Sequence, residues 1–208
     1  STLGRVVESG SRRLSNALYG PFESHRGDSG LTVDRDRGIP AGTLATLYDR
    51  GVPDALHARR DAAFFEWRFG NPTWSPTTYV ARRGGDPVAA MVTVTEGSND
   101  CTFTKVLEAL PIGGEGVEDA TGRLLAAVCR DHRESDVIKM ARSTVPRSVS
   151  RQFGFLGDNL PPLGWMTTDS TMVVRPLDSE AEAWTVGSHA LTDWDDWAIS
   201  FSEQDTAY

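Results

Sequence analysis

The sequence is poor in cysteine and lysine. Only 2 of its 208 residues are cysteines, and Cys101 and Cys129 lack the C-x-x-C spacing that is typical of metal and redox sites. Two reduced thiols are therefore expected rather than a disulfide bond, which favours the cytoplasm. Among the 21 basic residues, Lys105 and Lys139 are the only lysines, and with the acidic composition this favours a salt-adapted source.

The chain also lacks long apolar runs and an excess of positive charge. No stretch approaches the roughly 18 apolar residues that a membrane-spanning helix needs. The formal net charge is −8 and the pI is about 5.0, so a phosphate backbone is repelled on average. The four histidines show no ligand spacing with one another or with the cysteines. We therefore expect a cytoplasmic protein that contacts neither nucleic acid nor membrane and binds no metal.

What the sequence does have is the composition of a globular domain. Hydrophobic residues make up 39% and charged residues 24% of the chain, which is enough apolar surface to bury a core without disulfides or metal. Residues 1–30 are expected to form a lead-in helix and a linker, and residues 31–208 one domain. The first residue is a serine rather than methionine, and we expect the chain to be a piece of a longer protein.

Hydrophobic spacing and turn residues predict the order of helices and strands. Gly84–Pro87 and Gly97–Asp100 are turn sequences that join three extended segments, so these three strands should be antiparallel. Asp61 is a predicted N-cap and Pro146 a predicted first helical residue. The predicted strands are 31–35, 77–83, 88–96, 102–110, 137–141, 171–175 and 197–202, and the predicted helices are 41–50, 62–69, 117–134 and 148–153.

This order, β-α-α-β-β-β-α-β-α-β-β, resembles the GNAT (GCN5-related N-acetyltransferase) superfamily over residues 31–202. Gln152–Phe155 is similar to the aromatic-x-Gly-Phe sequence that ends the last helix of that family. The resemblance implies a mixed α+β fold with a central, mostly antiparallel sheet flanked by helices. The chain also looks like the C-terminal half of two-domain GNAT-like proteins of salt-loving microbes, with residues 64–69 and a Trp-rich tail as shared features.

The resemblance implies acetyl- or acyl-coenzyme A as co-substrate, bound between the fourth and fifth strands with its pyrophosphate on backbone N–H groups at the start of the next helix. Two features depart from the family pattern. Leu110 or Pro111 stands where an Arg or Gln is usual, and Glu115, Glu118 and Asp119 crowd the helix start. The turn is thus either a cofactor loop or an ordinary glycine-rich turn capped by acids. The expected cofactor-binding residues are Leu110, Ile112, Gly113, Gly114 and Gly116.

A carboxylate on a strand often serves as general base in this family. Glu108 is the candidate here, and its alternative is an exposed residue on the polar side of a strand. Where the family frequently has a Tyr as general acid, this chain has Ser150, a hydroxyl of much higher pKa. Proton return to the leaving thiolate therefore lacks an evident donor.

Three functions stay open. The first is an N-acyltransferase that transfers an acyl group to a small-molecule or peptide amine. The second is a catalytically degenerate GNAT-like half with a structural, dimerisation or substrate-groove role, which would work beside an upstream GNAT-like domain or as a homodimer. The third is an unrelated α+β domain that binds a ligand.

Overall fold

The fold was analysed in a computed structural model, which describes residues 30–98, 101–114, 116–157, 174 and 184–203. The predicted lead-in helix lies outside these residues. The predicted strand 171–175 also lies outside them, apart from Val174, which is in no strand. No helix in the described ranges is long and apolar enough to cross a membrane.

Five strands form the central sheet in the order of the sequence. The first four pair antiparallel with their neighbours, and the fifth joins the fourth in parallel. This is the mixed fold with a mostly antiparallel sheet that the sequence predicts, and the expectation is confirmed. The strands are β1 (Leu31–Arg37), β2 (Thr77–Arg83), β3 (Asp86–Ser98), β4 (Cys101–Leu110) and β5 (Val137–Met140).

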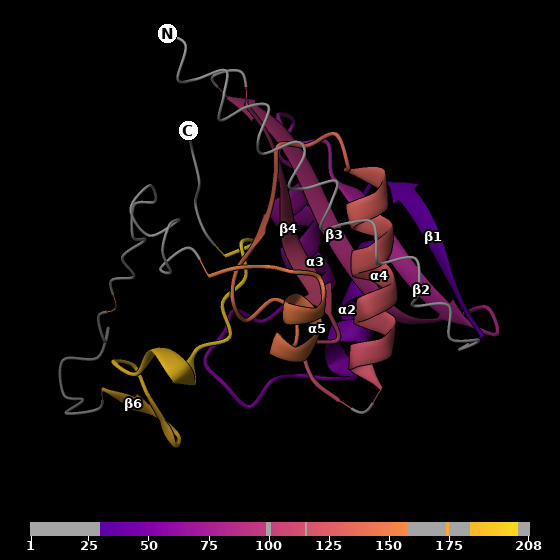
Figure 1. The fold of residues 1–208 in the computed structure, drawn as a ribbon. Helices are drawn as coiled ribbons and strands as arrows, with labels where there is room; N and C mark the ends of the chain where they lie inside the picture. Colours follow the sequence, from indigo (N-terminus) through magenta and orange to yellow (C-terminus); the bar gives the residue numbers. More distant parts are fainter. Residues whose placement is uncertain (1–29, 99–100, 115, 158–173, 175–183, 204–208) are drawn as a thin grey trace, which may run out of the picture.

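Helix α4 (Val117–Asp131) covers one face of the sheet and supplies the crossover that parallel neighbours require (Figure 1). Its buried stripe includes Leu124, Leu125 and Val128, which pack on the side of β2 and β3 that carries Tyr79 and Met91. Each such side chain contributes about 1.5–3 kcal/mol when it is fully buried. The short helix α5 (Arg147–Gln152) closes this core.

Helices α2 (Ala41–Asp49) and α3 (Ala62–Phe69) cover the opposite face (Figure 1). Asp61 is the N-cap of α3, as predicted, and its carboxylate accepts the N–H of Phe64 at 2.9 Å. Phe65 and Phe69 of this helix are buried in the second core. The sheet is therefore covered by helices on both faces, with one core on each.

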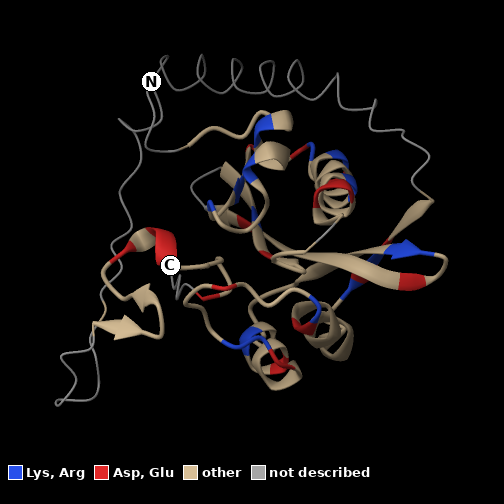
Figure 2. Cartoon of the chain, turned by 90° about the horizontal axis from the view of Figure 1, so that it is seen from below, with Lys and Arg blue, Asp and Glu red and all other residues tan. Residues whose placement is uncertain are grey.

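The C-terminal part differs from the prediction. Residues 197–202 form no strand, and only Trp197 makes an isolated bridge, to Leu56. A small hairpin, β6 (Thr185–Val186) and β7 (His189–Ala190), and the 3₁₀ turn η3 (Trp194–Asp196) precede this segment and were not predicted. Pro146 is the N-cap of α5 rather than its first residue. Acidic and basic residues are interspersed over the domain (Figure 2).

Candidate functional site

β4 and β5 pair over only four positions, from Phe103 opposite Val137 to Val106 opposite Met140. β5 ends there, whereas β4 continues along β3 to Leu110. A β-bulge follows the last paired position, because Thr93 lies opposite Val106 and Val92 lies opposite Glu108, which leaves Leu107 as the extra residue. The pairing of the two parallel strands therefore stops just before the bulge, and Glu108 lies two residues beyond the last paired position on β4.

The carboxylate of Glu108 lies in a buried polar cluster. Its Oε2 accepts from Nε of Arg60 at 2.6 Å, from the hydroxyl of Ser202 at 2.7 Å and from that of Ser200 at 3.0 Å. Arg60 also pairs with Glu203 at 2.9 Å. We call these residues, Arg60, Glu108, Ser200, Ser202 and Glu203, the Glu108 cluster. The strand alternative, in which Glu108 is exposed, is wrong, because the side chains of Arg60 and Glu108 are each 1% exposed.

The segment 198–203 brings three of these residues to β4. The N–H of Ser202 donates to the carbonyl of Leu107 at 3.1 Å, at the extra residue of the bulge. The N–H of Ala198 donates a hydrogen bond to the carbonyl of Leu56. The carbonyl of Ile199 accepts a hydrogen bond from the hydroxyl of Ser143, which follows β5. The segment therefore contacts β4 at the bulge and the chain just beyond β5, where the pairing of the two strands stops.

With these contacts Oε2 of Glu108 is not free to act as a base. A general base needs a free lone pair within reach of the proton that it removes, and Oε2 already accepts three hydrogen bonds. Its other oxygen, Oε1, accepts only the N–H of Ala109 at 3.3 Å. In this conformation the cluster ties the segment 198–203 to β4, and removal of the segment would release two of the three donors.

The predicted cofactor residues form a tight turn between β4 and α4. Leu110 is 2% exposed and packs with Ile112 into the core below α2. The N–H of Gly113 donates to the carbonyl of Gly51 at 3.3 Å, so it is not free for a phosphate. Pro111 has no N–H to offer. Gly114 and Gly116 are both exposed, and both have positive φ, 119° and 73°.

The N-terminus of α4 keeps part of its capacity to bind an anion. Gly116 is its N-cap and provides no side chain to cap the helix, so first-turn N–H groups lack that partner. Glu118 and Asp119 occupy the first turn, where they stabilise the helix dipole and oppose an added phosphate. The hydroxyl of Ser148 in α5 donates a hydrogen bond to Oε1 of Glu118 at 2.6 Å, which holds the carboxylate of Glu118 close to the turn.

Ser150 lies in α5, and its hydroxyl donates to the carbonyl of Arg147 at 3.1 Å. The structure thus brings together Glu108 and the start of the turn, but it adds residues that sequence reasoning missed. Arg60, Ser200 and Ser202 belong to no motif, and Arg60 and Glu108 lie 48 residues apart. The one available signal was chemical: a carboxylate on a buried strand requires a cation.

Comparisons with known proteins reveal two distant structural similarities. No family model matches the chain, and no curated protein matches it significantly. A GCN5-related N-acetyltransferase from Anabaena variabilis is similar, with a TM-score of 0.38 and 12% identity over 55% of this chain and 29% of that chain. Ribosomal-protein-alanine N-acetyltransferase from Brucella melitensis biovar Abortus has a TM-score of 0.40 and 14% identity over 70% of this chain and 99% of its own. At these identities no residue's role is transferred.

Proposed function

We propose that this domain is a GNAT-like N-acyltransferase whose acyl-coenzyme A site is the opening between β4 and β5, and that its own segment 198–203 closes this opening. One observation supports the proposal above others: the pairing of β4 with β5 stops at Val106 and Met140, with Glu108 two residues beyond it on β4 and a glycine turn leading into α4. Acetyl- or acyl-coenzyme A would be the co-substrate, and a small-molecule or peptide amine the acceptor.

In such a reaction the amine nitrogen attacks the thioester carbonyl, and the carbon–sulfur bond breaks to release a thiolate. Glu108 would take the proton that the amine loses, once its oxygen is released by Ser200 and Ser202. Gly114 and Gly116 would bring backbone N–H groups close to the pyrophosphate. Ser150 is too weak an acid to protonate the thiolate, so coenzyme A would leave as the thiolate and take its proton from the buffered solvent, to which Glu108 returns the proton of the amine.

A second candidate, a non-catalytic domain, is favoured by a different observation. Arg60 and Glu108 are both buried and paired, and separating a buried pair costs several kcal/mol. If the fold needs Glu108 to stay buried and paired with Arg60, its carboxylate has a structural role. In that case the domain would supply contacts to an upstream GNAT-like domain or to a second copy of itself.

Isothermal titration with acetyl-coenzyme A separates the two candidates. The full chain should be compared with a chain that ends at Ala198, which keeps both backbone hydrogen bonds of the anchor at Leu56. We expect micromolar binding by the shortened chain and weaker binding by the full chain, because the segment no longer competes for the opening. Circular dichroism of both chains confirms that each is folded.

The results have distinct consequences. Equal binding by both chains would contradict closure by the segment but keep the acyltransferase. No binding by either folded chain would contradict the acyltransferase and leave the structural role. If binding is seen, Glu108→Gln should abolish thiol release while coenzyme A still binds, and unchanged thiol release would remove Glu108 from the mechanism.

A further inference from the structure

The sheet face that α4 covers changes character beyond the end of that helix. On β1, Leu31 and Val33 pack against the α4 core, and two residues further on the same face carries Arg35 and Arg37. The neighbouring strands change in the same way. On β2 and β3 the apolar positions give way to Thr77, Thr93 and Thr95.

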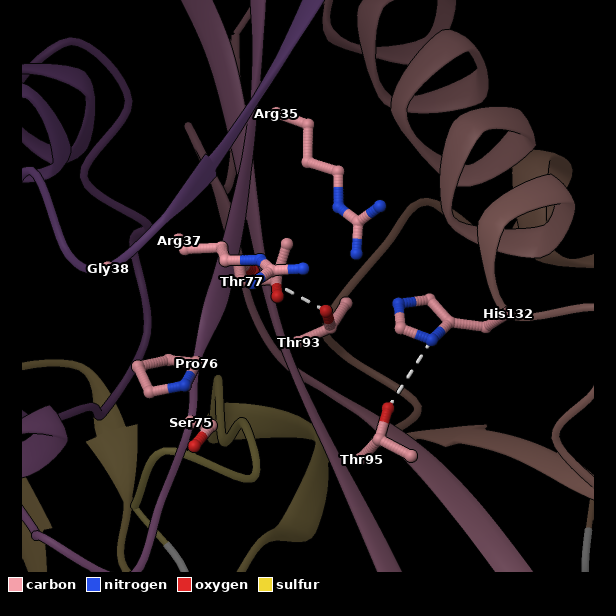
Figure 3. Close-up of a pocket in the computed structure, with 9 residues that line it drawn as sticks. All are labelled: Arg35, Arg37, Gly38, Ser75, Pro76, Thr77, Thr93, Thr95 and His132. Atoms are coloured by element: carbon pink, nitrogen blue, oxygen red, sulfur yellow. Dashed lines mark hydrogen bonds between the residues drawn. The ribbon is translucent and has the colours of Figure 1, made fainter.

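These residues line a cavity of about 540 Å³, with His132 at the C-terminal end of α4 on its opposite wall. Figure 3 shows the guanidinium groups of Arg35 and Arg37 and the ring of His132 directed into the same space. Thr93 is 1% exposed at the base of the cavity. The ring of His132 is held in place by Thr95 at 3.3 Å and by Tyr79 at 3.2 Å.

Positive charge in this cavity is only partly neutralised. Arg37 makes no ion pair within the described part of the chain, and Arg35 makes one long contact, to Asp131 at 3.5 Å. Asp131 is the carboxylate at this wall, and it also contacts Arg130 at 3.5 Å and accepts from Tyr79 at 3.3 Å. Asp34 and Asp36 alternate with the arginines along β1 and therefore lie on the other face of the sheet.

We propose that this cavity binds a tetrahedral oxyanion, inorganic phosphate or the phosphate group of a small monoester. A phosphate offers three or more acceptor oxygens, which suits two guanidinium groups, whereas one guanidinium satisfies a carboxylate. The cavity is larger than phosphate alone needs, so a monoester has room for its organic part. It lies on the α4 face, whereas the Glu108 cluster lies on the face of α2 and α3, so the two sites are independent.

The test is a titration of the full chain with inorganic phosphate at low ionic strength. Two-dimensional NMR and calorimetry monitor the binding. We expect saturable shifts at Thr95 and His132, because both line the cavity. Arg37→Gln should weaken binding by about tenfold or more, because a hydrogen bond to a charged group contributes about 1.5–3 kcal/mol. Arg83→Gln is the matched control, since Arg83 is an exposed arginine at the other end of the β1–β2 pair.

Two further probes define the ligand. Acetate should bind at least tenfold more weakly than phosphate, and tighter binding of glycerol phosphate than of inorganic phosphate would identify a monoester as the ligand. The proposal is overturned if shifts do not saturate, if acetate matches phosphate, or if Arg37→Gln and Arg83→Gln weaken binding equally. Circular dichroism of both variants excludes unfolding as the cause.

Discussion

Arg60 donates from Nε to Oε2 of Glu108 at 2.6 Å, and both side chains are 1% exposed. A buried ion pair of this kind contributes little net stability when it is intact, but the loss of one partner leaves a charge without compensation. Arg60→Met should therefore lower the free energy of unfolding by about 3–5 kcal/mol, as measured by urea denaturation.

The matched control is Arg59→Met, because the side chain of Arg59 is 83% exposed and makes a long contact of 3.8 Å with Asp61. Its effect should stay within about 0.5 kcal/mol. The double variant Arg60→Met, Glu108→Leu should recover part of the loss, since it removes both charges. Equal losses for Arg59→Met and Arg60→Met would contradict the structural role of the pair.

Gly51 and the glycine turn approach each other closely. A Cβ at Gly51 would lie 2.1 Å from the carbonyl oxygen of Gly113 and 2.7 Å from Cβ of Pro111. Gly51→Ala should therefore destabilise the protein by about 1–3 kcal/mol, the usual cost of overpacking, and displace the turn.

Gly42 supplies the comparison, because it lies inside α2 with nothing within 4 Å of its added Cβ. Gly42→Ala should stabilise the protein by up to about 1 kcal/mol through helix propensity. Thermal melts of the two variants should shift in opposite directions. A melting temperature that Gly51→Ala leaves unchanged would show that the turn moves freely.

The pKa values of His132 and His189 should lie on opposite sides of 6.5, the ordinary value for histidine. Burial, and then the charge of Arg35, lowers the pKa of His132. Hydrogen bonds to Asp196 and Asp54 raise the pKa of His189. NMR titration of the ring protons should show both shifts, and Asp196→Asn should move His189 back toward 6.5 without changing His132.

The two histidines affect stability with opposite sign. The contribution of His189 is complete below pH 6.5 and is lost as the pH rises through its raised pKa in the folded state. His132 lowers stability as the pH falls below 6.5, because the unfolded chain takes up that proton first. A hairpin that detaches on acidification rather than at high pH would contradict the assignment of His189.

The two thiols should differ in reactivity. Burial raises the pKa of Cys129 to about 12, and burial followed by the charge of Asp136 raises that of Cys101. Cys101 is partly exposed, whereas Cys129 is 6% exposed. With a disulfide reagent at pH 8, Cys101 should react slowly and Cys129 only after unfolding. Fast labelling of the Cys101→Ser variant in its native state would contradict this prediction.

Much of the fold could be predicted because it depends on local patterns. The extended segments and the glycine turns between them predict the antiparallel strands, and the apolar stripe of α4 predicts the helix on the sheet. The final segment could not be predicted, because Trp197–Ser202 reads as a strand whereas its backbone bonds go to Leu56 and Leu107. Those partners lie far away in the sequence and leave no periodic signal.

The candidate site was predictable only in outline. Glu108 and the turn follow from the order of strands, but the state of the carboxylate depends on Arg60, Ser200 and Ser202, which come from two distant loops. The arginines of β1 were equally hidden. The predicted strand ends at residue 35 and leaves out Asp36 and Arg37, which belong to β1 in the structure. The cavity itself also needs residues of β2, β3 and α4, which come from distant parts of the sequence.

β1 is the outermost strand of the sheet, and in the part of the chain that the structure describes no strand pairs with its outer edge. An open edge is a template on which a second molecule could add a strand and begin aggregation. Four consecutive charged residues, Asp34–Arg37, occupy this edge, and bringing two such edges together would desolvate all of them. Arg35 and Arg37, which line the cavity, thus also belong to the run that keeps neighbouring molecules from joining their sheets.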